Sequence, residues 1–171
     1  MTLPAPPLIK MAEFLLISSD IYHPFVVTIY ILLREALTKS KTMLNLSELI
    51  LSDNEVGVEG AKAIASSNLL GNLVSLWLGD KLGDDGVKAI AESESLTRLT
   101  QLSLYRNGMG DEGAIAIANS KNLAKLEELN LNWNFVEEEG LEALANSETL
   151  KNLTQLTMTY NPIGPRGAEI I

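Results

Sequence analysis

The feature that most constrains this chain is an internal repeat with a period of 27 residues. Copies begin at positions 46, 99, 126 and 153, and a copy at position 73 is one residue short, with Asp80 or Lys81 where the others have asparagine. The recurring residues of the first copy are Leu46, Leu49, Leu51, Asn54, Val56, Gly57 and Gly60. A sequence of this kind is expected to stack one structural unit several times instead of folding around a single closed core.

The second half of each copy places apolar residues at helical spacing. Its first instance, over residues 63–70, reads Ala-Ile-Ala-x-Ser-x-x-Leu, and the pattern returns from positions 89, 116 and 143, with Leu144 in place of isoleucine in the last. The leucine-rich first half alternates apolar and polar residues, as a strand does. Each unit is therefore predicted to be one short strand, a turn and one helix.

The residue types of the repeat fit this unit. Leu49 and Leu51 point to the same side of a strand, so successive strands are expected to form a parallel sheet whose inner face the helices cover. One unit cannot bury that face alone, and the units must stack. The recurring asparagine is expected to hydrogen-bond buried backbone groups where each strand ends.

Glycine and acidic residues are expected to shape the link between strand and helix. The fourth copy has Glu137 where the others have glycine, so a different turn is expected there. The acidic pairs at 84–85 and 111–112 stand where helices begin, and the helix dipole favours negative charge at that end. The glycines expected to allow a positive φ or a close backbone approach are Gly57, Gly83, Gly110 and Gly164.

These motifs resemble the ribonuclease-inhibitor type of leucine-rich repeat, and the Gly-Ala-x-Ala-Ile-Ala-x-Ser form is similar to the bacterial GALA-type variants. The resemblance covers residues 34–171. It implies an α/β, right-handed solenoid with a parallel sheet of about five strands on the concave face and helices on the convex face. It also implies protein recognition, since most members bind proteins, although a fold does not name the partner.

The repeat domain is predicted to span residues 34–171, with a partial repeat at 34–45 and repeats that begin near 46, 73, 99, 126 and 153. The last repeat is incomplete, because the sequence ends at Ile171 inside an expected helix. We therefore expect this chain to be either a piece of a longer array or a degenerate gene product. We also expect self-association through its uncapped C-terminal repeat, because open strand edges pair with other chains.

Residues 1–33 form an apolar N-terminal segment outside the repeat frame, and three interpretations are open. The first is a cap helix that begins near Pro24. The second is a membrane anchor or signal-like segment over residues 14–33. This segment reaches the ~20 residues that a membrane span requires, but Asp20, His23 and Pro24 interrupt it. The third is an F-box-like adaptor, suggested by Leu3, Pro4, Leu8 and Ile9.

Several classes of site have no residues to support them. The chain has no cysteine, which excludes disulfides and thiolate metal sites and favours the cytosol. Its one histidine, His23, has no Gly-x-Ser-x-Gly turn to complement it, and no phosphate-binding glycine motif occurs. Glu137–Glu139 is interpreted as a solvated helix start, and the sequons at Asn45 and Asn152 as products of the repeat. We predict no catalytic residue, no cofactor and no metal.

The charge of the chain restricts its partners. The formal net charge is −9, and the first 43 residues hold four basic and three acidic side chains, so residues 44–171 carry −10. An acidic body repels phosphate backbones and steers basic partners toward it. Nucleic acid is therefore not expected as a ligand.

Candidate binding residues come from strand positions that alternate with the core leucines, and from the strand ends. Both tryptophans and two of the four tyrosines fall there. Tryptophan, tyrosine and arginine are enriched among interface hot spots. An alternative for Trp133 and Tyr160 is that they shield the strand-end turns. The predicted protein-binding residues are Trp77, Tyr105, Arg106, Asn130, Asn132, Trp133 and Tyr160.

These inferences favour a cytoplasmic protein-protein interaction module that is not an enzyme. One alternative is a regulator of an enzyme, either a Ran-type GTPase-activating protein or an F-box-like ubiquitin-ligase adaptor. Another is a membrane-tethered repeat protein. For localisation, the alternatives are a secreted effector and a membrane-anchored protein.

Overall fold

The structure is a computed structural model, and it describes residues 44–170 apart from positions 53, 55 and 80. The predictions made for residues 1–33, namely the cap helix, the membrane anchor and the F-box-like motif, lie outside the described residues, as does nearly all of the partial repeat at 34–45.

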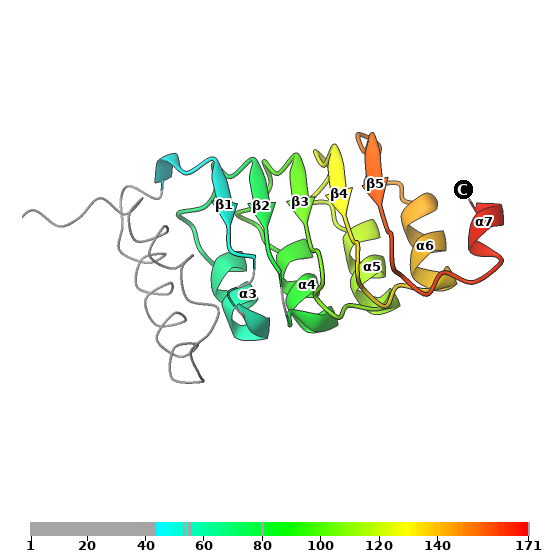
Figure 1. The fold of residues 1–171 in the computed structure, drawn as a ribbon. Coiled ribbons are helices and arrows are strands. Elements are labelled where there is room, and N and C mark those ends of the chain that lie inside the picture. The colour runs from blue at the N-terminus through cyan, green and yellow to red at the C-terminus, as the bar shows by residue number, and fades with distance from the viewer. Residues whose placement is uncertain (1–43, 53, 55, 80, 171) are drawn as a thin grey trace, which may run out of the picture.

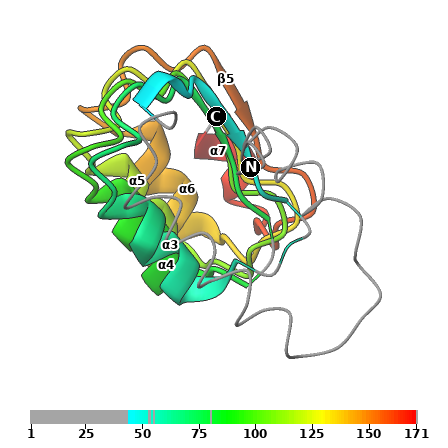
Figure 2. The ribbon, with the colours of Figure 1, turned by 90° about the vertical axis from the view of Figure 1, so that its left-hand side faces the viewer.

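Five short parallel strands form one sheet in the order of the sequence. The strands are β1 (Glu48–Ile50), β2 (Ser75–Trp77), β3 (Gln101–Ser103), β4 (Glu128–Asn130) and β5 (Gln155–Thr157). The helices that follow them in turn are α3 (Gly57–Ala65), α4 (Gly83–Ala91), α5 (Asp111–Ala118), α6 (Glu138–Ala145) and α7 (Gly167–Ile170). Figure 1 shows the strands in one row and the helices in a second row, and Figure 2 shows these two layers along the stack.

The strand register follows the leucine frame of the sequence. Leu76 of β2 pairs with Leu49 on one side and with Leu102 on the other. The one-residue deletion in the second repeat therefore lies after its strand and does not shift the strand register. Leu129 and Leu156 continue the row. The predicted fold class, an α/β solenoid with a parallel sheet of five strands and a helical layer, is confirmed.

A continuous apolar core lies between the two layers. It runs from Leu51 to Leu150, and its central leucines and isoleucines are at most 2% exposed. The fifth repeat is less well covered, as expected: its apolar residues Leu153, Leu156, Met158, Ile163 and Ile170 are only partly buried. No helix in the described part of the chain has the length and apolar character needed to cross a bilayer.

The recurring asparagine links neighbouring repeats through buried backbone groups. Asn107 donates from Nδ2 to the carbonyl oxygen of Leu78 at 3.0 Å, and Asn134 donates to that of Leu104 at 2.9 Å. The Oδ1 atom of Asn134 also accepts the backbone N–H of Asn107 at 2.9 Å. Both side chains are almost fully buried, so the predicted structural role of this asparagine is confirmed.

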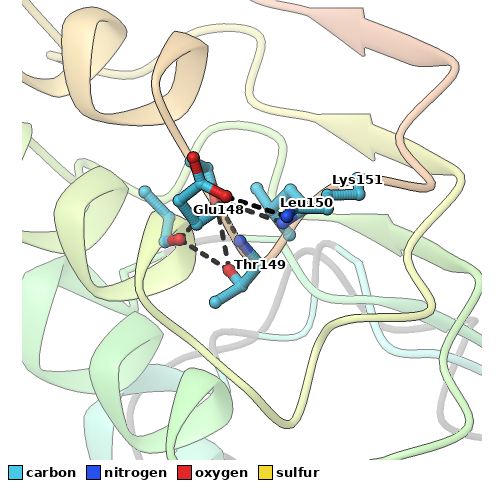
Figure 3. A network of polar contacts seen from close by, with 6 residues as sticks. Glu148, Thr149, Leu150 and Lys151 are labelled. Carbon is cyan, nitrogen blue, oxygen red and sulfur yellow. Dashed lines mark hydrogen bonds and ion pairs between the residues drawn. The ribbon is translucent and has the colours of Figure 1, made fainter.

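A recurring serine makes the corresponding link at the other end of the helices. Ser147 donates from Oγ to the carbonyl oxygen of Ala118 at 2.5 Å, and Thr149 donates to the same oxygen at 2.7 Å. Ser93 and Ser120 bond the preceding repeat in the same way. Figure 3 shows this network beside an exposed ion pair, in which the Lys151 ammonium lies 2.8 Å from the Glu148 carboxylate. That contact lowers the pKa of Glu148 and raises the pKa of Lys151.

The acidic residues at the helix starts act on the following helix. Asp111 accepts the backbone N–H groups of Glu137 at 2.7 Å and of Gly140 at 3.0 Å, both at the start of α6. Asp84 does the same for α5. The sequence-based interpretation, in which each acid interacts with the dipole of its own helix, therefore missed the main contact, which joins adjacent repeats.

The turns also differ from expectation. Gly83 has a positive φ of 57°, because its N–H donates to the carbonyl oxygen of Asn107. Gly110 and Glu137 are both extended instead, with φ of −111° and −105°, because their N–H groups point to the carboxylates of the preceding repeat. The fourth turn thus differs from the first two, where Gly57 and Gly83 have a positive φ, but Glu137 has the same extended backbone as Gly110. The positive φ that was considered for Gly110 is found instead at Gly108.

Candidate protein-binding surface

The sheet face opposite the helices carries Trp77 on β2, and Tyr105 lies in the turn that follows β3. Trp77 is 44% exposed between the buried Leu76 and Leu78, and Tyr105 is 37% exposed after the buried Leu104. The indole N–H of Trp77 donates to Oγ of Ser75 at 3.0 Å, which fixes the ring on the surface. Ile50, which pairs with Trp77 in the register of β1 and β2, is also 44% exposed. An apolar and aromatic patch therefore spans β1 to β3.

The C-terminal half of the same face is made of amides and hydroxyls. Asn130 donates to Oγ of Ser103 at 3.3 Å, and its Oδ1 accepts from Thr157 at 3.1 Å. The Oδ1 of Asn132 accepts the N–H of Thr159 at 2.6 Å. Both asparagines are half-buried and clamp neighbouring strands, so they contribute to the sheet as well as to its surface.

The sheet face carries no charge over its two central columns of side chains. These are the residues between the paired core leucines and the residues one step beyond the second leucine. Charged residues border them, with Glu128 at a strand start and Arg106 at a strand end. The acidic charge of the chain therefore lies outside these two columns. The ten uncharged positions are Ile50, Ser52, Trp77, Gly79, Ser103, Tyr105, Asn130, Asn132, Thr157 and Thr159.

The other predicted residues lie at the strand-end edge of the sheet. Arg106, Trp133 and Tyr160 have positive φ values of 57°, 59° and 60°. This backbone lets the N–H of Trp133 donate to the carbonyl oxygen of Thr159 at 2.9 Å, while Asn134 turns inward. A left-handed backbone costs a non-glycine residue about 1–2 kcal/mol. The structure thus holds two bulky aromatic residues in a conformation that favours glycine.

The two rings at this edge stack on each other. The ring centroids of Trp133 and Tyr160 lie 4.2 Å apart, with 32° between the ring planes. Even so, Trp133 is 50% exposed and Tyr160 is 67% exposed. The alternative role that the sequence left open, shielding of the turns, accounts for only part of their surface.

One exposed aromatic residue was missed by the sequence reasoning. Phe135 is 67% exposed and lies over Gly108, where a Cβ would be 3.9 Å from Cε2 of the phenyl ring. The other repeats have Glu55, Gly108 and Pro162 at this turn position, and the second repeat lacks a residue in this turn. A comparison of the repeats column by column would have identified Phe135 as the one bulky apolar residue there.

The described residues offer few features that would indicate a catalytic or metal-binding site. Within them, no group of three or more histidine, cysteine or acidic residues is placed to hold a metal ion. The only histidine, His23, lies outside them. An open depression of about 560 Å³ lies on the helical side between α4 and α5, lined by residues such as Lys88, Glu92, Glu112 and Ile115.

The fold and the surface together define an α/β repeat solenoid with two uncharged columns of side chains on its sheet face and an aromatic strand-end edge. The family model described as a leucine-rich repeat matches residues 42–65, 95–118, 122–145 and 149–171, more than half of the chain. The chain belongs to the leucine-rich-repeat family. The stretch between the first two matches contains the short repeat that begins at Leu73. Membership of this family supports a protein-interaction module in general terms.

No curated protein matches the chain. Among solved structures, the chain is similar to an internalin from Listeria monocytogenes, with 19% sequence identity and a TM-score of 0.37. The match covers 77% of this chain and 48% of the internalin chain, so this chain spans about half the length of that protein.

Proposed function

We propose that this chain is a protein-binding module that recognises its partner on the concave face of the sheet, and that it is not an enzyme. The observation that carries the proposal is the placement of two exposed rings, Trp77 on the paired strand β2 and Tyr105 in the turn after β3, where the N–H groups of Leu104 and Arg106 bond to the next repeat. Rings of this kind add contact area at low entropic cost. Asn130 and Asn132 extend the surface, and Arg106, Trp133 and Tyr160 border it.

The composition of the face supports a protein partner. Tyrosine and tryptophan beside serine, glycine and asparagine are the residues that antibody paratopes favour, because the rings anchor while the small polar groups adapt their hydrogen bonds. Since the two central columns carry no charge, the partner should present an uncharged patch to them. The acidic body then contributes to the rate of encounter more than to the contact itself.

The finer family assignment and the location belong to this proposal. Helices of eight or nine residues in the first four repeats, together with the Ala-Ile-Ala-x-Ser pattern, support the ribonuclease-inhibitor type and its GALA-like form. The absence of cysteine supports a cytoplasmic location. Self-association of the 171-residue chain through β5 stays a prediction, which light scattering over a range of concentrations would test.

Affinity capture with matched variants tests the binding proposal. The wild-type chain and a Trp77→Ala/Tyr105→Ala double variant are immobilised and exposed to lysate of the source cell. A Glu92→Ala/Glu142→Ala double variant on the exposed helical face is the control. We expect a protein retained by the wild type and the control but lost from the aromatic variant. Equal retention by all three chains would contradict recognition through the concave face.

A further inference from the structure

A second surface lies at the strand-end edge of the fourth and fifth repeats. It consists of the exposed rings of Trp133, Phe135 and Tyr160, and we refer to it as the aromatic edge. Phe135 and Trp133 are two residues apart, and Tyr160 belongs to the next repeat and stacks on Trp133. This edge is distinct from the uncharged columns that carry Trp77 and Tyr105.

The rings of the aromatic edge are held in place by backbone contacts. The N–H of Trp133 donates to Thr159, and the N–H of Phe135 donates to the carbonyl oxygen of Met109 at 2.8 Å. Trp133 and Tyr160 keep the left-handed backbone described above although half or more of each side chain is exposed. Lys81 and Arg106 have the same left-handed backbone, so this conformation belongs to the repeated turn. At the fourth and fifth repeats the side chains that this turn presents are the exposed rings of Trp133 and Tyr160.

The aromatic edge adjoins the acidic start of the helices. A Cβ on Gly110, the residue before α5, would lie 3.7 Å from the carbonyl oxygen of Phe135. Glu137 follows two residues after Phe135, and its side chain and that of Glu139 are exposed. Glu138 is engaged within the stack, because it accepts the backbone N–H of Arg166 at 3.1 Å. Glu137 and Glu139 therefore supply two exposed carboxylates, two and four residues beyond Phe135 in the sequence.

This part of the chain has no positive charge of its own. Residues 126–150 hold seven acidic side chains and no lysine or arginine. The first helices differ, since Lys62 and Lys88 stand in the last turns of α3 and α4, whereas α5 and α6 have no basic residue there. Two arginines of the neighbouring repeats lie close by. Arg106 precedes Trp133 in the strand-end column, and the Arg166 guanidinium lies 3.9 Å from the carboxylate of Glu138, which leaves Glu137 and Glu139 as the exposed acids beyond Phe135. Charge complementarity points to a cationic ligand for the fourth repeat.

We propose that the aromatic edge binds an arginine-containing, positively charged segment of a protein partner. A guanidinium group stacks on open aromatic faces and attracts their π electrons. The carboxylates of Glu137 and Glu139 then neutralise the remaining charge of the segment. The proposal adds a surface to the concave face and does not depend on it.

Tryptophan fluorescence tests the proposal on the full chain. The sequence has two tryptophans, so a Trp77→Phe background leaves Trp133 as the reporter. The probe is an acetylated and amidated hexa-arginine peptide, with hexaglutamate as the opposite-charge control. We expect a saturable change in Trp133 emission with hexa-arginine and none with hexaglutamate. The affinity should fall with added salt, because exposed charges are screened.

Substitutions distinguish peptide binding at the aromatic edge from nonspecific attraction of the peptide to the acidic chain. We expect Phe135→Ser, and equally Phe135→Leu, to weaken the peptide about fivefold to tenfold, since either removes a π face worth on the order of 1 kcal/mol. Glu137→Gln/Glu139→Gln should weaken it similarly. Glu92→Gln/Glu94→Gln removes the same charge from exposed positions of the second repeat and should have little effect.

Two results would contradict binding of the peptide at the aromatic edge. Equal weakening by the two glutamine pairs, or unchanged binding in both Phe135 variants, would show that the peptide responds only to net charge and would overturn the proposal. Adding Tyr105→Ala to the Trp77→Phe background should leave peptide binding intact. A failure of the concave-face proposal is therefore distinguishable from a failure of this one.

Discussion

The carboxylate of Asp84 in α4 accepts a hydrogen bond of 2.8 Å from the backbone N–H of Gly113 in α5. The same Oδ1 atom accepts the N–H of Gly110. The second and third repeats, through Asp84 and Asp111, thus each supply an N-terminal cap for the helix of the next repeat, and stacking and helix stability are coupled there. The link is absent between the first two repeats, where Val58 occupies the position of Asp84.

The first prediction concerns this cap. Asp84→Ala should lower the free energy of unfolding by about 1–2 kcal/mol, because it leaves two backbone N–H groups of α5 without their acceptor. Asp84→Asn keeps an acceptor oxygen and should lose less. Chemical denaturation measures both variants. Asp85→Ala is the control, since Asp85 is exposed, and an equal loss from it would contradict the assignment.

The second prediction concerns the row of leucines. Leu102→Ala or Leu129→Ala should cost about 2–5 kcal/mol, as expected for large-to-small changes at buried positions, and in a small array this can unfold the chain. Leu156 occupies the same column in the fifth repeat but is only partly buried, so Leu156→Ala should cost less. An unchanged denaturation midpoint for both central variants would contradict the strand assignment.

The third prediction concerns the asparagine column. Asn134 donates to the carbonyl oxygens of Leu104 and Leu131 and accepts the N–H groups of Asn107 and Met109. Asn134→Ala leaves several buried groups unpaired and should cost about 2–4 kcal/mol, at roughly 1–3 kcal/mol for each unsatisfied group.

Asn54 is the matched control for Asn134. It is half-buried and donates to the carbonyl oxygen of Ser52 in its own repeat. Asn54→Ala should therefore cost under about 1 kcal/mol. Similar losses for Asn54→Ala and Asn134→Ala, measured by thermal and chemical unfolding, would show that the bonds between repeats contribute little.

The periodic residues made most of this fold predictable. Leucines at period two fix the face of each strand, and their recurrence every 27 residues fixes which leucines lie side by side, even across the short second repeat. The asparagine was interpretable for the same reason. An amide at a strand end, followed by an apolar residue, has backbone groups within reach whatever the details of the turn.

The features that could not be predicted from the sequence depend on contacts between neighbouring repeats. Asp84 stands at the start of its own helix in the sequence, but Gly110, one of the groups that it caps, is 26 residues further along. The conformation of Glu137 follows from Asp111 in the preceding repeat. Phe135 was missed for a different reason, because the candidate columns covered the strands and the first positions after them, and Phe135 lies two residues beyond Trp133.

The two binding surfaces should respond differently to salt. The central columns of the concave face carry no charge, so affinity of a partner bound there should change little between low and moderate ionic strength. Binding of hexa-arginine at the aromatic edge should weaken over the same range. Titrations at two salt concentrations compare them, and a strong salt dependence of the dissociation rate on the concave face would contradict the assignment.

The last prediction concerns Trp77, which lies outward between the buried Leu76 and Leu78. Trp77→Ala should weaken partner binding by on the order of 2 kcal/mol if the ring is an interface anchor. It should leave circular dichroism and the melting curve nearly unchanged, because the backbone of β2 is paired on both sides and its core leucines remain in place. Ile50→Ala, which removes the exposed neighbour of the ring on β1, should weaken binding less. Normal binding combined with early melting of Trp77→Ala would place the indole in the core and shift the strand phase by one residue.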